Sequence, residues 1–270
     1  MSQHIPFFIT MPHSGEKVPE QCVWLQSLPE EILMCDVDRY IDVLYQPTID
    51  QLSMRSEKTE WHRYAVDLNR IPTDIDESSV EGSLNAAGLF DRGFHWVVTT
   101  KNDILLNKPI SQKLHQELSD LIYEPFHQKV RAQFSYFKSK GCDKVFHLDA
   151  HSMPSLGTKM HKDPGERRAD IVISDSLGKS CSSQYRDIVI AAYVTAGFKV
   201  GYNWPYIGGR LTECYGKPEL GQQTIQVELN RALYMDEVTK KIKPEHIDIQ
   251  KKIQLAVSKI KSDLGTIIEH

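Results

Sequence analysis

Short apolar runs that alternate with longer amphipathic segments constrain the fold of this chain more than any other feature of its sequence. The runs expected to form strands are residues 5–11, 63–68, 94–100, 144–148, 169–173, 198–202 and 224–229. Apolar residues at helical spacing predict helices over residues 29–52 (interrupted near Pro47), 109–139 and 179–196. Such alternation is typical of α/β proteins. The sequence therefore predicts a single αβα layered domain over residues 1–270, with a mixed, mostly parallel sheet and a C-terminal helix, 244–263, as its outer cover.

Composition and charge argue against several other classes of protein. The 270 residues are 40% hydrophobic and 25% charged, and 32 Lys and Arg against 36 Asp and Glu leave a net charge of −4. This balance gives no electrostatic basis for binding nucleic acid or an anionic membrane. The five cysteines include no C-x-x-C pair, which argues against a disulfide framework and a thiolate zinc site. Neither a signal peptide nor an apolar stretch of the ~20 residues needed to span a membrane is evident, so we expect a cytoplasmic protein.

Polar residues with metal-binding or substrate-binding potential gather just after three of the predicted strands. They are His13, Asn69, Arg70, Asp149 and His151. Ligands of open α/β sheets bind in the crevice outside the carboxyl ends of the strands. We therefore expect these residues to converge on one site.

Two of these groups have the composition of a metal site. His13 and Glu16 form an H-x-x-E pair, which on the first turn of a helix places an imidazole and a carboxylate on one face. Along an extended segment, Asp149 and His151 point to the same side. Asp149 could bind a metal directly, or it could hold the tautomer of His151 through a hydrogen bond. The alternative is a strand-end pair that only satisfies nearby backbone groups.

Three arginines are candidates for contact with an anionic ligand. Asn69 and Arg70 together offer an amide and a planar guanidinium fork that suits a carboxylate. Arg63 could polarise a carbonyl group and stabilise an oxyanion, although a solvated charge is the simpler interpretation. Arg210 follows a pair of glycines that permit close approach of a ligand to the backbone, so it could contact an anion there.

Glu228 lies inside an apolar strand pattern, where an unpaired carboxylate is costly. It must be paired, associated with a metal, or held with the raised pKa of a general base. An ion pair with Arg231, three residues further on, is the structural alternative. The sequence contains no G-x-S-x-G, Walker A or G-x-G-x-x-G motif, so serine hydrolase and nucleotide-binding functions have no motif support.

Taken in order, several segments resemble the N-formylglutamate amidohydrolase (N-formylglutamate deformylase) family. They are PHSG at 12–15, DRYIDVLY at 38–45, VDLNR at 66–70, LDAHS at 148–152, ADIVISD at 169–175, GG at 208–209, and YGKP with QVELNRALYMDE within 215–237. The resemblance implies a phosphorylase/hydrolase-like αβα fold, similar to zinc exopeptidases such as carboxypeptidases and aspartoacylase. It also implies hydrolysis of a small N-acyl amino acid. The type reaction converts N-formyl-L-glutamate to formate and L-glutamate in histidine breakdown.

The resemblance further implies a metal centre. His13 and His151 are similar to the two histidine ligands of the exopeptidases, and either Glu16 or Asp36 would complete a site for one Zn²⁺ with an open position for water. Glu228 resembles the exopeptidase general base, and Asp149 would hold the tautomer of His151 through a hydrogen bond.

For the substrate, the resemblance implies that Asn69 and Arg70 hold a carboxylate, as the similar segment of aspartoacylase does. Arg210 is the second candidate guanidinium for a dicarboxylate, and Arg63 is the candidate oxyanion partner. Two alternatives remain open from the sequence. One is an aspartoacylase-like or carboxypeptidase-like enzyme of other acyl specificity, and the other is a non-catalytic dicarboxylate-binding protein. Divalent metals other than zinc also accept imidazole and carboxylate ligands.

Overall fold

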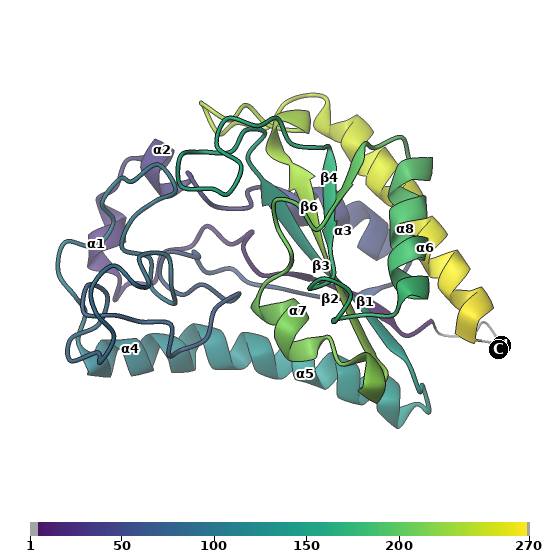
Figure 1. Cartoon of the computed structure of the whole chain (residues 1–270), viewed down its shortest axis with the longest axis horizontal. Coiled ribbons are helices and arrows are strands. Elements are labelled where there is room, and N and C mark those ends of the chain that lie inside the picture. The colour runs from purple at the N-terminus through teal and green to yellow at the C-terminus, as the bar shows by residue number, and fades with distance from the viewer. Residues whose placement is uncertain (1–4, 269–270) are drawn as a thin grey trace.

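In the computed structural model, which describes residues 5–268, a six-stranded sheet lies between layers of helices (Figure 1). Its strands, in spatial order, are β2 (Arg55–Lys58), β1 (Phe7–Met11), β3 (Val145–Met153), β6 (Gln222–Asn230), β4 (Ile171–Ser174) and β5 (Val200–Tyr202). The first four run parallel to one another, whereas β4 pairs antiparallel with β6 and parallel with β5. The sheet is therefore mixed and mostly parallel, as predicted.

Helices cover both faces of this sheet, and Figure 1 shows the two layers. On one face lie α3 (Ile41–Gln51), α6 (Ser183–Thr195) and α8 (His246–Ile268). On the other lie α4 (Gln112–Leu118), the π-helix η1 (Ser119–Tyr123), α5 (Glu124–Ser139) and α7 (Arg210–Tyr215). The connections contain α1 (Val23–Gln26), α2 (Glu30–Leu33) and the 3₁₀ turns η2 (Pro218–Leu220) and η3 (Arg231–Leu233). This arrangement is the predicted αβα layered domain.

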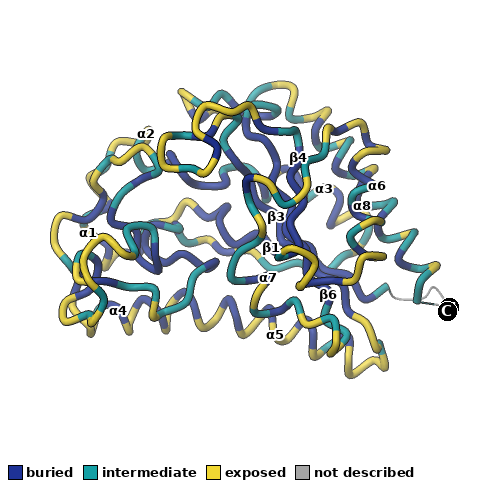
Figure 2. Tube along the Cα trace, in the orientation of Figure 1, coloured by how far each residue is buried: buried dark blue, intermediate teal, exposed yellow. Residues whose placement is uncertain are grey.

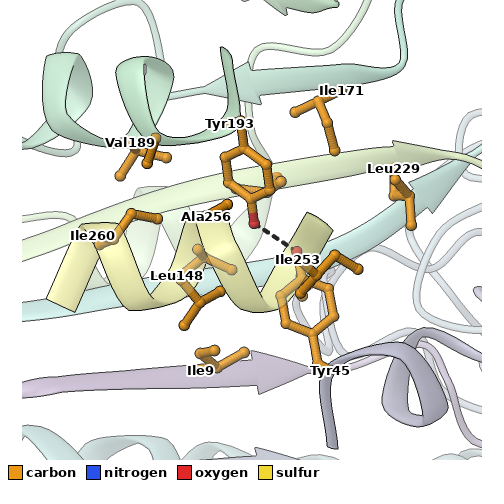
Figure 3. Packing of buried hydrophobic residues seen from close by; sticks show 14 of the residues in the cluster. Ile9, Tyr45, Leu148, Ile171, Val189, Tyr193, Leu229, Ile253, Ala256 and Ile260 are labelled. Atoms are coloured by element: carbon orange, nitrogen blue, oxygen red, sulfur yellow. Dashed lines mark hydrogen bonds between the residues drawn. The ribbon is translucent and has the colours of Figure 1, made fainter. Parts of the chain in front are cut away.

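The face covered by α3, α6 and α8 is the larger apolar core (Figure 3). Ile9 of β1 and Leu148 of β3 pack there with Ile253 of α8, all fully buried. Tyr45 and Tyr193 also enter this core, and their hydroxyls form a hydrogen bond of 2.8 Å with each other. Because an unpaired buried hydroxyl destabilises a core, this mutual bond lets two tyrosines join α3 to α6.

The opposite face of β3 and β6 is polar toward the carboxyl ends of the strands. Because successive side chains of a strand point to opposite faces, His147, Asp149 and His151 all project from this face. The strand register places Gln226 beside Asp149 and Glu228 beside His151. Alternation within two buried strands thus brings two carboxylates, an imidazole and an amide to one face of the sheet, near the carboxyl ends of β3 and β6.

Two of the predicted strands, residues 63–68 and 94–100, are wrong: both segments are loops, and only the second contains isolated bridges, at Trp96 and Val98. Their apolar residues are buried, but side chains rather than a sheet satisfy part of the backbone. His95 bonds to the carbonyl of Ala65, and the amide of Tyr64 donates to His62. Burial without strand pairing therefore produced the strand-like pattern.

Other element boundaries also differ from the sequence prediction. The charged edge strand β2 was not predicted, because an edge strand does not need alternating apolar residues. Residues 29–52 form two helices, α2 and α3, and Pro47 lies inside α3 rather than ending it. The C-terminal helix begins at His246 and covers α3 and α6, with exposed residues along its outer side (Figure 2). Within residues 5–268, no helix is long and apolar enough to cross a membrane.

Candidate active site

A cavity of about 260 Å³ lies at the carboxyl ends of β1, β3 and β6. The sheet contributes His151 and Glu228 to its wall, and His13 enters two residues after β1 ends. Loops between β2 and α4 contribute Arg63 and Arg70. The structure thus brings together residues that the sequence analysis placed after three predicted strands. One of these three segments, residues 63–68, is a loop.

The centre of this site is a cluster of His13, Asp38 and His151, in which one ligand atom from each residue lies within 4.8 Å of the others. The Nδ1 atoms of His13 and His151 lie 3.5 Å and 3.2 Å from Oδ2 of Asp38. All three residues are buried. Two imidazole nitrogens and one carboxylate oxygen that converge in this way form a donor set suited to a divalent metal.

Each histidine of the cluster is held from behind by a second carboxylate. Nε2 of His13 lies 2.7 Å from Asp67, and Nε2 of His151 lies 2.7 Å from Asp149. These bonds fix the orientation of both rings and direct Nδ1 toward Asp38. Nδ1 of His13 is buried without a hydrogen-bond partner among residues 5–268, so the protein leaves this nitrogen available to a ligand.

Asp38 is fixed by groups from the end of the sheet. Its Oδ1 atom accepts hydrogen bonds of 3.0 Å from both Arg231 and Ser152. Burial alone would raise the pKa of Asp38, but the imidazoles of His13 and His151 outweigh it and hold that pKa well below its usual value. Asp38 is therefore a carboxylate, with Oδ1 bound to the protein and Oδ2 facing the two imidazoles.

Neither carboxylate that the sequence analysis proposed as the third ligand lies in this cluster. Glu16 points to the surface, where it forms an ion pair of 2.8 Å with Arg39, because the chain after His13 does not continue as a helix. Asp36 lines the cavity, but its carboxylate accepts hydrogen bonds from Tyr64 and Thr100. Neither Glu16 nor Asp36 therefore lies where it could join His13 and His151, and the carboxylate that does is that of Asp38.

Glu228 lies beside His151 and is 6% exposed. Its Oε1 atom accepts a hydrogen bond of 2.8 Å from Gln226, two residues earlier on the same face of β6. Burial raises the pKa of Glu228, and the negative charge of Asp38 adds to the effect. The structural alternative, an ion pair with Arg231, does not form, since Arg231 binds Asp38 instead. A buried carboxylate with a raised pKa beside the cluster has the character of a general base.

Arg63 faces the same cavity but is tied to the protein. Its Nη1 and Nη2 atoms donate to the carbonyl of Asp36 and to Asp67, both at 2.9 Å, and its guanidinium stacks over Trp96. The interpretation of Arg63 as a freely solvated charge is therefore wrong. Its charge is held at the cavity wall with a fixed orientation.

The predicted substrate-binding residues divide into two groups. Asn69 and Arg70 line the cavity, with Oδ1 of Asn69 accepting from the amide of Leu211. Arg210 is not among the cavity residues; it begins α7 and contacts Tyr123 on the side facing η1. The cavity instead contains Arg92, which the sequence analysis did not select. The expectation for Arg210 is therefore not supported by its position.

Comparison with known proteins identifies the family of this chain. The sequence profile of the N-formylglutamate amidohydrolase family matches residues 5–235. The chain belongs to this family. The N-formylglutamate deformylase of Pseudomonas aeruginosa is 26% identical over 238 residues, which cover 86% of this chain and 83% of that protein.

Two solved structures resemble the chain. That of N-formylglutamate amidohydrolase from Ralstonia eutropha JMP134 gives a TM-score of 0.87 at 24% identity, with 97% of this chain and 95% of that one covered. A gene product of Agrobacterium tumefaciens gives a TM-score of 0.70 at 17% identity, with 97% and 91% covered. At these identities the two structures show that the N-formylglutamate amidohydrolase fold extends over nearly the whole chain.

Besides Arg92, the sequence analysis did not select three further residues of the site. Asp38 begins the family-like segment DRYIDVLY, and its two-residue spacing from Asp36 was a signal that either aspartate could serve as a ligand. Asp67 stands in DLNR immediately before Asn69, in a segment interpreted as a strand. Gln226 alternates with Glu228 in the same strand pattern, which alone places both on one face.

Proposed function

We propose that this protein is a zinc-dependent amidohydrolase that converts N-formyl-L-glutamate and water to formate and L-glutamate, as a step in histidine degradation. One observation carries the proposal. Two buried histidines, each bonded to a carboxylate through Nε2, direct Nδ1 toward a third carboxylate, Asp38, beside the buried Glu228. Membership of the N-formylglutamate amidohydrolase family supports the choice of substrate.

The residues of the cluster fit a zinc ion. His13 and His151 would supply two nitrogen ligands and Asp38 one oxygen ligand, and three protein ligands with an open fourth position are typical of catalytic zinc. The unpartnered, buried Nδ1 of His13 agrees with this role, because a buried nitrogen without a partner is costly unless a ligand satisfies it. Zinc bound there would lower the pKa of water and polarise the formyl carbonyl.

Glu228 moves the protons of the reaction. Its carboxylate accepts a proton from the water whose oxygen forms the new bond to the formyl carbon. When the bond between that carbon and the amide nitrogen breaks, Glu228 returns the proton to the leaving amine, so formate and the free amino acid are released. Gln226 holds one oxygen of Glu228, which leaves the other oriented for this exchange.

Arginines and Asn69 complete the proposed site. The fixed guanidinium of Arg63 supplies positive charge near the oxygen on which negative charge develops. Asn69 and Arg70 face the cavity and are suited to hold a substrate carboxylate. Because Arg63 and Arg70 are positioned by backbone carbonyls and by Asp67, they add charge to the cavity wall without needing to reorganise.

Formate release measured by NMR tests this proposal. N-formyl-L-glutamate would be compared with N-acetyl-L-aspartate and a C-terminal peptide, using protein as purified, after chelation, and after reloading with Zn²⁺. We expect formate from N-formyl-L-glutamate alone, lost on chelation and restored by zinc. Cleavage of another substrate would retain the mechanism and change the specificity. No turnover with any metal would refute the enzyme function.

A further inference from the structure

Four guanidinium groups line the cavity, and they differ in how their charge is neutralised. Arg231 forms an ion pair of 3.0 Å with Asp38, and Arg63 forms one of 2.9 Å with Asp67. Within residues 5–268, Arg70 and Arg92 form no ion pair with a carboxylate. Two of the four guanidinium groups in this small cavity are therefore left without a direct carboxylate partner in the described part of the chain.

The side chain of Arg70 lies against the backbone of Arg92. Nε of Arg70 donates to the carbonyl of Arg92 at 3.0 Å, and Nη1 of Arg70 donates to the carbonyl of Asn69 at 3.0 Å. Nη1 of Arg92 is buried and has no hydrogen-bond partner in the described part of the chain. Guanidinium groups without a carboxylate partner, one of them with a buried unsatisfied donor, favour the binding of an anion in the cavity.

The loop that holds Arg92 is built to a fixed conformation. A side chain on the following residue, Gly93, would place its Cβ 2.2 Å from the carbonyl oxygen of Asp74. The amide of Phe94 donates to that same carbonyl at 2.7 Å, and Arg92 itself pairs with Trp96 in an antiparallel bridge. Arg92 is thus held at the cavity by its backbone, as a residue that recognises a ligand must be.

We infer that Arg92 is a specificity-determining residue that, together with Arg70, makes the enzyme select dicarboxylic N-formyl amino acids over those with a single carboxylate. This inference rests on the proposed function and deepens it. N-formylglutamate carries one carboxylate for each of the two arginines. Arg210, the cation that the sequence offered for the second carboxylate, contacts Tyr123 instead of lining the cavity.

Three substrates that differ only in charge test the inference. They are N-formyl-L-glutamate, its γ-amide N-formyl-L-glutamine, and its α-amide N-formyl-L-isoglutamine. For Arg92→Gln we expect kcat/KM for N-formyl-L-glutamate to fall about 10- to 100-fold, mainly through KM, the range expected for loss of a charged hydrogen bond. The preference over one of the two monoamides should fall by a similar factor. Zinc content and Tm should stay close to those of the wild type.

Two further variants keep the result interpretable. Arg92→Lys retains the charge without the guanidinium fork, so it should keep part of the preference even if Arg92→Gln folds poorly. Arg210→Gln removes a cation of the same type outside the cavity and should leave all three kcat/KM values unchanged.

The outcomes separate the inference from the function on which it rests. A wild type that releases formate, combined with unchanged substrate ratios in both Arg92 variants, would overturn the inference alone. An equal fall for all three substrates would also overturn it, since that pattern indicates general damage. A wild type that releases no formate from any of the three would overturn the proposed function and the inference with it.

Discussion

His151, at the sheet, and the histidines that hold the loop segment 62–70 have pKa values shifted in opposite directions. On the sheet side, His151 faces the carboxylates Asp149 and Asp38; burial lowers its pKa, but these charges outweigh burial and raise that pKa well above its usual value. On what we call the loop side, the segment 62–70 with the side chains that bond to it, His62 and His127 of α5 face backbone groups and a hydroxyl, and burial lowers the pKa of each to about 4. His151 thus lies among carboxylates, whereas His62 and His127 are neutral rings that serve as structural hydrogen-bond partners.

The difference follows from how each side is built. Strand register fixes the residues of β3 and β6, so their polar face needs little additional support. The segment 62–70 has no strand pairing and is held by side chains that bond to its backbone. The rigid carboxyl ends of the strands suit the proposed metal site and general base. Loops held by side chains can vary in sequence and so determine which substrate fits.

Removing the central carboxylate should have the largest effect on the sheet side. We expect Asp38→Asn to lose zinc, measured by mass spectrometry of the metal content, and to release no detectable formate. The amide would present a neutral oxygen to the metal, so an anionic ligand is lost. Glu16→Gln is the matched control: it removes a nearby carboxylate that pairs with Arg39, and both zinc content and turnover should be retained. Full zinc content in Asp38→Asn would contradict its assignment as a ligand.

Replacing the proposed base should affect the same side in a different way. Glu228→Gln keeps the shape of the side chain but cannot accept a proton at neutral pH. We expect kcat to fall by about 10²- to 10⁴-fold, the usual contribution of general acid–base catalysis, while zinc content and KM change little. Single-turnover kinetics and metal analysis on the same sample measure both. A fully active variant would refute the role of Glu228, and loss of zinc would make it a ligand instead.

The sheet side was also the part that the sequence predicted best. His13, Asp149, His151 and Glu228 stand in or directly after buried strands, where alternation and strand order decide which side chains meet. Asp38 was not predicted, because its position depends on hydrogen bonds from Arg231 and Ser152, which are remote in sequence.

The loop side shows the limit of periodicity as a predictor. Residues 63–68 have the apolar pattern of a strand because they are buried, yet they form no strand. Their backbone groups bond to the side chains of His95 and His127 and to the backbone of Phe94 and Trp96. The resemblance to a known family identified Asn69 and Arg70, which do line the cavity, from the motif alone. Arg92 lies in an irregular loop with no periodic pattern, and only the folded loops bring it next to Arg70.

A change on the loop side should separate substrate binding from metal binding. We expect Arg70→Ala to raise KM for N-formyl-L-glutamate about 10- to 100-fold, as the loss of a charged hydrogen bond implies, with kcat less affected. Zinc content should equal that of the wild type, because Arg70 bonds only to backbone carbonyls in the loop region. Initial rates over a range of substrate concentrations, with metal analysis, measure both. Loss of zinc would show that the two sides are not independent.

The smallest expected effect concerns acid pH and tests how the loop side is held. His62 accepts a hydrogen bond from the amide of Tyr64, and His127 donates to the carbonyl of Leu68. His95 bonds to the carbonyl of Ala65, and burial lowers its pKa to about 3. Protonation would add a hydrogen to Nδ1 of His62, which now accepts from an amide that can only donate, and it would place a charge on each of the three buried rings.

The sign of the pH effect follows from these lowered pKa values. Between about pH 6.5 and pH 4, the opened or unfolded segment binds more protons than the folded one, so its stability decreases as the pH falls through this window. At pH 5 the loss is about 2 kcal/mol for each histidine released. Hydrogen exchange should therefore show faster opening of residues 62–70 at pH 5 than at pH 7, after correction for intrinsic rates.

A pair of variants makes this test specific to the buried rings. Glutamine in His127→Gln can still donate to Leu68 and accept from Tyr215, but it does not titrate, so the pH dependence of opening should shrink. His246→Gln, at the start of α8 on the opposite face of the sheet, should leave the dependence unchanged. Equal protection of residues 62–70 at both pH values in the wild type would contradict the inference that neutral histidines hold this segment. The two sides would then differ only in their backbone structure, paired strands on one side and loops on the other.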